Sequence, residues 1–89
     1  MKAVVSVIGK DKTGIIATVS NFLFEHGVNI IDISQSVLGE YFAMIMMVDI
    51  SASSTDIAKL ADLAKTMGEK IGVSVTVQHE DIFNAMHKI

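Results

Sequence analysis

Hydrophobic and polar residues repeat with two different periods along the chain, and the switches between the periods mark six elements. Residues 73–78 alternate between apolar and polar side chains, which is typical of a half-buried strand. Residues 57–71 instead place apolar side chains every three or four positions, which is typical of a helix packed on one face. The whole pattern predicts strands over about 2–8, 28–37, 41–50 and 73–78, and helices over about 13–26 and from a cap at Ser53 or Ser54 to residue 71.

The order of these elements is βαββαβ, which predicts a ferredoxin-like fold. Gly27 and Gly72 each follow a helical pattern at the position that favours a left-handed cap. The connection Leu38-Gly39-Glu40 is short enough to close a hairpin between the two middle strands. Two βαβ units with right-handed crossovers form a four-stranded antiparallel sheet with both helices on one face. We therefore expect one α+β, ferredoxin-like sandwich over residues 1–79.

Residues 80–89 add a short amphipathic segment, which we expect to form a C-terminal tail helix. Ile82, Phe83 and Met86 recur there at helical spacing. The third strand is apolar on both faces from Met44 to Val48, so the sheet face without helices needs a cover. The tail helix or a partner subunit could supply it.

The composition predicts self-association and gives no indication of a membrane segment. The chain has 89 residues, of which 51% are hydrophobic, whereas a domain of this size buries only about 60–65% of the surface of its unfolded chain. The longest unbroken apolar run, residues 42–48, is far shorter than the ~20 residues of a membrane helix. We expect a homodimer in the cytoplasm, with no membrane partner and no signal peptide.

The charged residues argue against nucleic acid as a partner. Ten acidic and seven basic residues give a net charge of −3. All seven basic residues are lysines scattered along the chain, and arginine, the usual residue for bidentate contacts to phosphate or guanine, is absent.

A polar loop bracketed by glycines, Gly9-Lys10-Asp11-Lys12-Thr13-Gly14, joins the first strand to the first helix. A helix start offers unpaired backbone N–H groups and the positive end of the helix dipole, so it can hold a carboxylate or phosphate without a cationic side chain. The equivalent turn before the second helix, Ser51-Ala52-Ser53-Ser54-Thr55, has neither glycine nor charge. This contrast indicates a binding role for the first loop.

The sequence lacks residues that catalytic, nucleotide-binding and metal sites require. The glycine loop is similar to the start of a P-loop, but Ile15 and Ile16 stand where lysine and a hydroxyl residue would hold phosphate and Mg²⁺. Cysteine is absent, and the histidines come with no nucleophile elbow and no metal-binding pair at helical spacing. The cluster His79-Glu80-Asp81 also lacks ligand spacing. We expect no enzyme activity, no catalytic residue, no metal and no cofactor.

Three short motifs together resemble the ACT domain family, including its small stand-alone bacterial members. They are residues 11–14, the helix start 15–19 and the turn Gly27-Val28-Asn29-Ile30, and the resemblance covers roughly residues 1–79. It implies that two copies pair side by side through their sheet edges and hold an amino acid or related metabolite between them. It places the ligand-binding residues in the loop of one copy and at the start of the second strand of its neighbour: Asp11, Lys12, Thr13, Gly14 and Asn29.

These residues have plausible chemical roles. Backbone amides around Thr13 and Gly14 could bind a ligand carboxylate, Asp11 could accept from its ammonium group, and Asn29 could donate or accept. Structural interpretations stay open as well: Asp11 can stabilise a helix start, Lys12 can be solvated, and Asn29 can close the turn after Gly27.

The function implied is a regulatory module that senses an amino acid or related metabolite. Because no enzyme or DNA-binding domain accompanies the ACT-like segment, the regulated protein is expected to be separate. The alternative is an interaction module, similar to accessory repressor-like proteins, whose paired sheets and apolar tail bind a partner while the loop holds no ligand.

Overall fold

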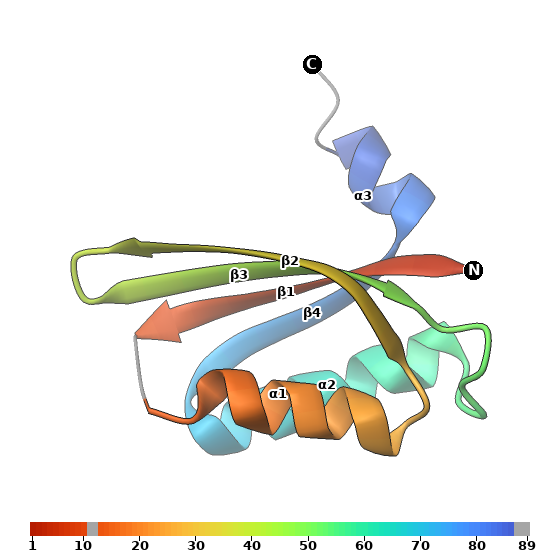
Figure 1. The fold of residues 1–89 in the computed structure, drawn as a ribbon, viewed down its shortest axis with the longest axis horizontal. Coiled ribbons are helices and arrows are strands. Elements are labelled where there is room, and N and C mark those ends of the chain that lie inside the picture. The colour runs from red at the N-terminus through yellow and green to blue at the C-terminus, as the bar shows by residue number, and fades with distance from the viewer. Residues whose placement is uncertain (11–12, 87–89) are drawn as a thin grey trace.

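The computed structural model describes residues 1–10 and 13–86, and it contains the expected βαββαβ order followed by a C-terminal helix (Figure 1). The elements, in chain order, are β1 (Lys2–Lys10), α1 (Ile15–Glu25), β2 (Asn29–Leu38), β3 (Tyr41–Asp49), α2 (Ile57–Ile71), β4 (Val73–His79) and α3 (Glu80–Met86). Within these described ranges, no helix is long and apolar enough to cross a membrane.

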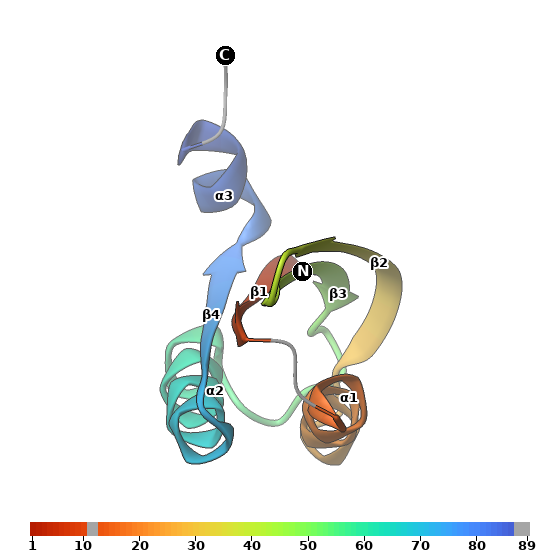
Figure 2. The same cartoon turned by 90° about the vertical axis from the view of Figure 1, so that its left-hand side faces the viewer.

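The four strands form one antiparallel sheet in the order β2-β3-β1-β4. Both α1 and α2 lie on one face of this sheet, and α3 rises from the other face (Figures 1 and 2). Gly39 has φ 64°, a conformation that costs glycine nothing, and the two-residue turn Gly39-Glu40 closes the β2–β3 hairpin. The predicted ferredoxin-like fold is therefore confirmed.

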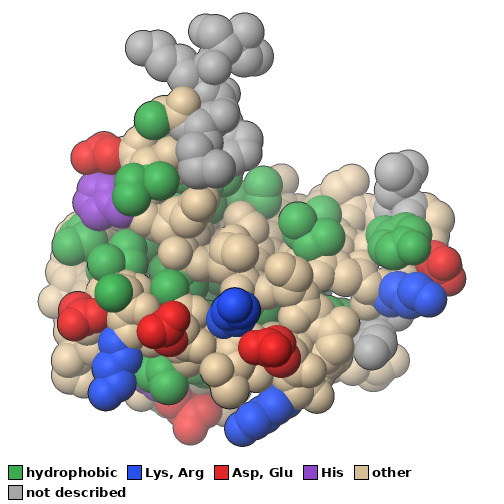
Figure 3. All heavy atoms as spheres, turned by 180° about the vertical axis from the view of Figure 1, so that it is seen from behind, with side chains coloured by type: hydrophobic (Ala, Val, Ile, Leu, Met, Phe, Trp, Pro, Cys, Tyr) green, Lys and Arg blue, Asp and Glu red, His purple; other side chains and the backbone are tan. Residues whose placement is uncertain are grey.

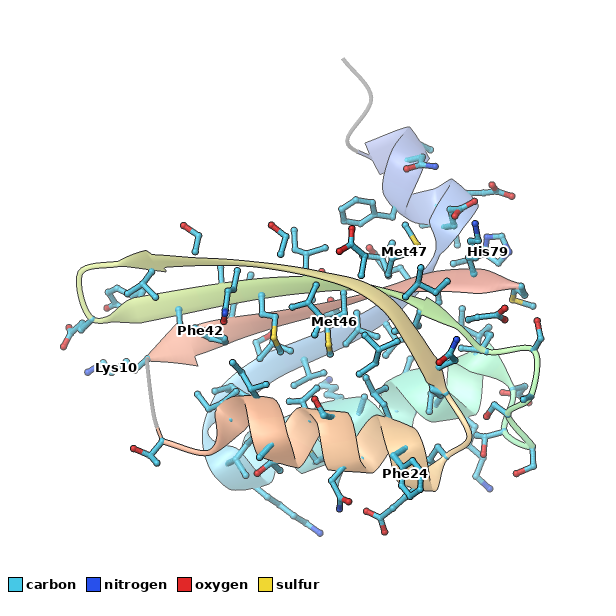
Figure 4. All side chains as sticks on the ribbon, viewed as in Figure 1. Lys10, Phe24, Phe42, Met46, Met47 and His79 are labelled. Carbon is cyan, nitrogen blue, oxygen red and sulfur yellow. The ribbon has the colours of Figure 1, made fainter. Side chains whose placement is uncertain are left out.

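The core lies between the sheet and the two helices. On β1 and β3 every second residue is buried against α1 and α2, as the pleat of a strand requires. Figure 4 shows this alternation on β3, where Met46 lies on the helix side of the sheet and Met47 on the side of α3. The most deeply buried core side chains include Val5, Val7, Val19, Leu23, Met46 and Leu60.

The start of α2 differs from the prediction, because Asp56 rather than Ser53 or Ser54 is its N-cap. The Lys59 amide donates to Asp56 Oδ1 at 2.8 Å. Ser53 instead closes the preceding turn, where its Oγ accepts from the Thr55 amide at 3.2 Å.

Gly68 has a packing role that the helical period does not reveal. A Cβ at this position would lie 2.8 Å from the Val73 carbonyl oxygen and 2.7 Å from Val75 Cγ2. The missing side chain therefore lets α2 approach β4 closely, and this contact holds the second helix on the sheet.

Candidate functional site

The loop between β1 and α1 leaves the N-terminus of α1 open. Helix α1 begins at Ile15, two residues later than predicted, and Gly14 is its N-cap with φ 88°. The Gly14 carbonyl accepts from the Thr18 amide at 2.9 Å, but no side chain of the described residues caps the amides of the first turn. Thr13 and Gly14 are exposed. The predicted site residues Asp11 and Lys12 lie outside the described residues.

The two helix starts on the core side of the sheet are therefore unlike each other. At the start of α2, the carboxylate of Asp56 accepts a hydrogen bond from the Lys59 amide of the first turn. The corresponding amides at the start of α1 carry the same partial positive charge, yet they meet no capping side chain in the described part of the chain. An exogenous carboxylate could supply there what Asp56 supplies to α2.

Asn29 lies at the opposite end of the sheet from this loop. Lys10, the last residue of β1, pairs with Tyr41 at the start of β3, whereas Asn29 pairs with Asp49 at the end of β3. Tyr41 and Asp49 are eight positions apart along the extended strand, which is about 26 Å. One copy of the chain thus does not bring Asn29 to Thr13 and Gly14, although each is exposed.

The surroundings of Asn29 are irregular and partly acidic. A β-bulge interrupts the β2–β3 register between Ile30 and Asp32, and bulges are frequent beside functional sites. The neighbouring carboxyl, Asp49, has its pKa lowered by side-chain and backbone hydrogen bonds from Ser51. The Ser51 amide donates to Asp49 Oδ1 at 2.9 Å.

A hollow that the sequence pattern does not predict lies next to this end of the sheet. Its volume is about 430 Å³, and it is lined largely by the turn before α2, from Ile50 to Ile57. The run of hydroxyl residues from Ser51 to Thr55 is the only sequence signal for it, and such a run is also typical of an ordinary turn. The structure brings that turn against Gly27, where an added Cβ would lie 3.1 Å from the Ala52 carbonyl oxygen.

No metal centre accompanies these features among the described residues, since no group of three or more His, Cys, Asp or Glu side chains could hold an ion there. His79, the histidine considered as a ligand, instead accepts a hydrogen bond at Nδ1 from the Asp81 amide at 3.0 Å. It therefore acts in the junction between β4 and α3.

A sequence profile of the ACT domain family matches residues 2–78. The chain belongs to the ACT domain family. Among related ACT proteins, a UPF0237 protein of Methanocaldococcus jannaschii is 53% identical over 88 residues, which cover 99% of this chain and 98% of that protein. A UPF0237 protein of Clostridium perfringens is 52% identical over 89 residues and is matched over its full length.

The fold comparison agrees with the ACT assignment. An ACT domain protein from Streptococcus pneumoniae superposes with a TM-score of 0.83 at 44% identity, covering 98% of each chain. ACT domains are regulatory, ligand-binding modules.

Proposed function

We propose that this ACT protein binds an amino acid or a related metabolite at a site shared by two copies of the chain, and that the occupied dimer modulates a separate protein. The observation that carries the proposal is the open N-terminus of α1: its amides meet no capping side chain among the described residues, whereas Asp56 closes α2. A ligand carboxylate matches both the hydrogen-bonding capacity and the dipole of this position.

A dimer joined along β2 would complete the site. β2 is an edge strand that runs from Asn29 to Leu38, and Leu38 pairs with Tyr41 at the end of the sheet where the loop lies. When two β2 strands lie antiparallel, the Asn29 end of one faces the Leu38 end of the other. Asn29 of one copy would then approach Gly14 of its neighbour, and its amide could bind the polar end of the ligand.

The side of the molecule along α1 and β2 has the apolar surface that such a dimer needs. We name it the α1–β2 flank and define it by its exposed hydrophobic residues Ile16, Phe24, Ile31, Ile33 and Val37. Phe24 is 78% exposed and points away from the sheet near the end of α1 (Figure 4). Two such flanks would bury each other's apolar surface, which is the main driving force for association.

At one position, backbone hydrogen bonds between two β2 strands would stabilise the dimer less than the apolar side chains do. The Ile33 amide already donates to Asp32 Oδ1 at 2.9 Å, so strand pairing through that amide would have to displace the carboxylate. We therefore attribute the dimer chiefly to the apolar flank.

The regulated protein would be a separate chain. The Clostridium perfringens relative is matched over its full length by these 89 residues, which leaves no room in that relative for an attached enzyme or DNA-binding domain. Binding rather than catalysis is the role that fits the described residues, since ligand occupancy can favour one arrangement of the dimer over another.

The test is thermal unfolding in the presence of each of the protein amino acids in turn. A ligand at about 100 times its Kd adds about 2.7 kcal/mol to the free energy of unfolding, which raises the Tm by roughly 10 °C or more for a chain of this size. We expect one amino acid or a small chemical group of them to do so, and we expect Asn29→Ala to remove the effect.

Asn21→Ala is the matched control, because Asn21 is an exposed asparagine on α1 whose side chain donates a hydrogen bond from Nδ2 to Glu25 Oε1 at 2.8 Å. It should keep the full ligand effect. If no amino acid raises the Tm of the wild-type chain, the interaction-module alternative without a ligand is favoured instead.

A further inference from the structure

The sheet face opposite α1 and α2, here called the outer face, is uncharged along the middle of β1 and β3, while Asp32, the partner of Met47, lies beside them on the edge strand β2. On β1 the residues that alternate with the core positions are Val4, Ser6 and Ile8, and their partners on β3 are Met47, Ile45 and Ala43. Charge appears on these two rows only at their ends, at Lys2, Lys10 and Asp49. Such a surface is suited to contact with another apolar surface.

Helix α3 covers only one end of the outer face. It contacts β1 and β4, and Val4 at that end is 2% exposed although it does not belong to the core beneath the helices. At the hairpin end Ile8 is 57% exposed, and a hollow of about 230 Å³ is lined by Ile8, Ser36, Tyr41, Phe42 and Ala43. Among the described residues, none covers this hairpin end of the outer face.

Helix α3 itself is a projecting element. It has seven residues and rises away from the sheet rather than lying along it (Figures 1 and 2). Isolated helices shorter than about 12 residues are marginally stable in water, so α3 gains from a further surface to pack on. Ile82 is 55% exposed, and Figure 3 shows hydrophobic side chains where α3 joins the body, next to a histidine and an acidic side chain.

We propose that the outer face binds the outer face of a second copy of this chain, with α3 of each copy packed at the hairpin end of the other. A projecting apolar helix and an apolar hollow at opposite ends of one face are self-complementary about a two-fold axis, because each copy then fills the hollow of its partner. A partner of another kind would have to offer both features at the same spacing.

Charge favours this head-to-tail arrangement. The first turn of α3 carries Glu80 and Asp81, and the outer row of β1 ends at the hairpin end with Lys10. Head-to-tail stacking brings the acidic first turn of α3 to an end of the sheet where Lys10 lies beside Glu40, whereas stacking with both α3 helices at the same end would place two acidic turns together, with Lys2 as a nearby cation. This contact uses a different surface from the α1–β2 flank and does not depend on the ligand site.

Cysteine cross-linking tests the contact directly, because the wild-type chain contains no cysteine. Chains carrying Ile82→Cys are mixed with chains carrying Ile8→Cys, refolded together and treated with a short bismaleimide. Val37→Cys replaces Ile8→Cys in the control, since Val37 is 58% exposed but lies on the α1–β2 flank. We expect a cross-linked heterodimer with Ile8→Cys at least five-fold more abundant than with Val37→Cys. Equal yields, or no product with either, would overturn the proposal.

A second measurement separates this contact from the dimer of the proposed function. Ile45 lies in the middle of the outer face and is exposed, so Ile45→Glu should fold while placing two like charges in the contact. We expect light scattering to give a lower molar mass for Ile45→Glu than for the wild type, with the amino-acid effect on Tm retained. An unchanged mass would contradict the proposal, whatever the outcome of the ligand test.

Discussion

Replacing Gly14 with alanine tests the backbone geometry and the ligand site together. Gly14 has φ +88°, and an added Cβ would meet no atom within 4 Å. The cost of the substitution is therefore backbone strain without a clash. Alanine also makes the unfolded chain less flexible, which offsets part of this cost. We therefore expect a net loss of about 1 kcal/mol in the free energy of unfolding. For a domain of this size that lowers the Tm by about 5 °C.

Gly39→Ala is the matched control for this substitution. Gly39 has φ +64°, and an added Cβ there would also meet no atom within 4 Å, so we expect a similar loss of about 5 °C. Only Gly14 belongs to the proposed ligand site, so only there should an added methyl group interfere with a ligand at the start of α1. An amino acid identified by the Tm survey should therefore stabilise Gly39→Ala by the wild-type amount and Gly14→Ala by little or nothing.

Circular dichroism is the appropriate assay, because the chain has no tryptophan whose fluorescence could report unfolding. The Tm of each variant is measured without ligand and at about 100 times the wild-type Kd, where the expected gain is about 2.7 kcal/mol. If Gly14→Ala keeps that whole gain, the ligand does not bind at the start of α1. If the apo Tm of neither variant falls, the left-handed conformations assigned to these glycines are wrong.

Two further predictions concern the scaffold. Leu60 is fully buried between α2 and the sheet, so Leu60→Ala should lower the free energy of unfolding by about 3 kcal/mol, whereas Leu63→Ala, at a half-buried position outside the core, should cost clearly less in chemical denaturation. The lowered pKa of Asp49 means that its ionised form stabilises the fold, so this stability is present at neutral pH and is lost as the pH falls through and below the usual range of a carboxyl group. The Tm difference between wild type and Asp49→Asn should therefore shrink between about pH 5 and pH 2, and a constant difference would show that Asp49 is not the titrating group.

The hydrophobic periods predicted the fold because each element buries one face against the same core. The strict alternation of residues 73–78 and the helical stripe of residues 57–71 each allow only one orientation on the sheet, so the βαββαβ order determined the topology. The cap of α2 was harder to predict, since Ser53, Ser54 and Asp56 are all good cap residues. In the structure Asp56 caps α2 while Ser53 closes the preceding turn, and cap preference alone does not separate the three residues.

Gly68 and the candidate site illustrate what depends on tertiary structure. Gly68 sits within a regular helical pattern, and only the position of β4 explains why a side chain has no room there. The family resemblance pointed to Gly14 and Asn29, but the separation between them follows from the length of β3 and the antiparallel register. That separation is the reason why the proposed site requires two copies of the chain.

The shared site is tested most directly by complementation between two defective variants. Gly14→Ala and Asn29→Ala chains are unfolded, mixed in equal amounts and refolded together. Each mixed dimer then contains one site with both defects and one intact site, formed by the loop of the Asn29→Ala chain and Asn29 of the Gly14→Ala chain.

Isothermal titration of the refolded mixture with the amino acid that stabilises the wild type gives the decisive number. Random pairing makes half of the dimers mixed, so we predict about a quarter of the wild-type number of sites, with wild-type affinity. The same variants refolded separately and then combined should show no such sites. Binding that is no greater in the co-refolded mixture than in this control would contradict a ligand site built from two copies of the chain.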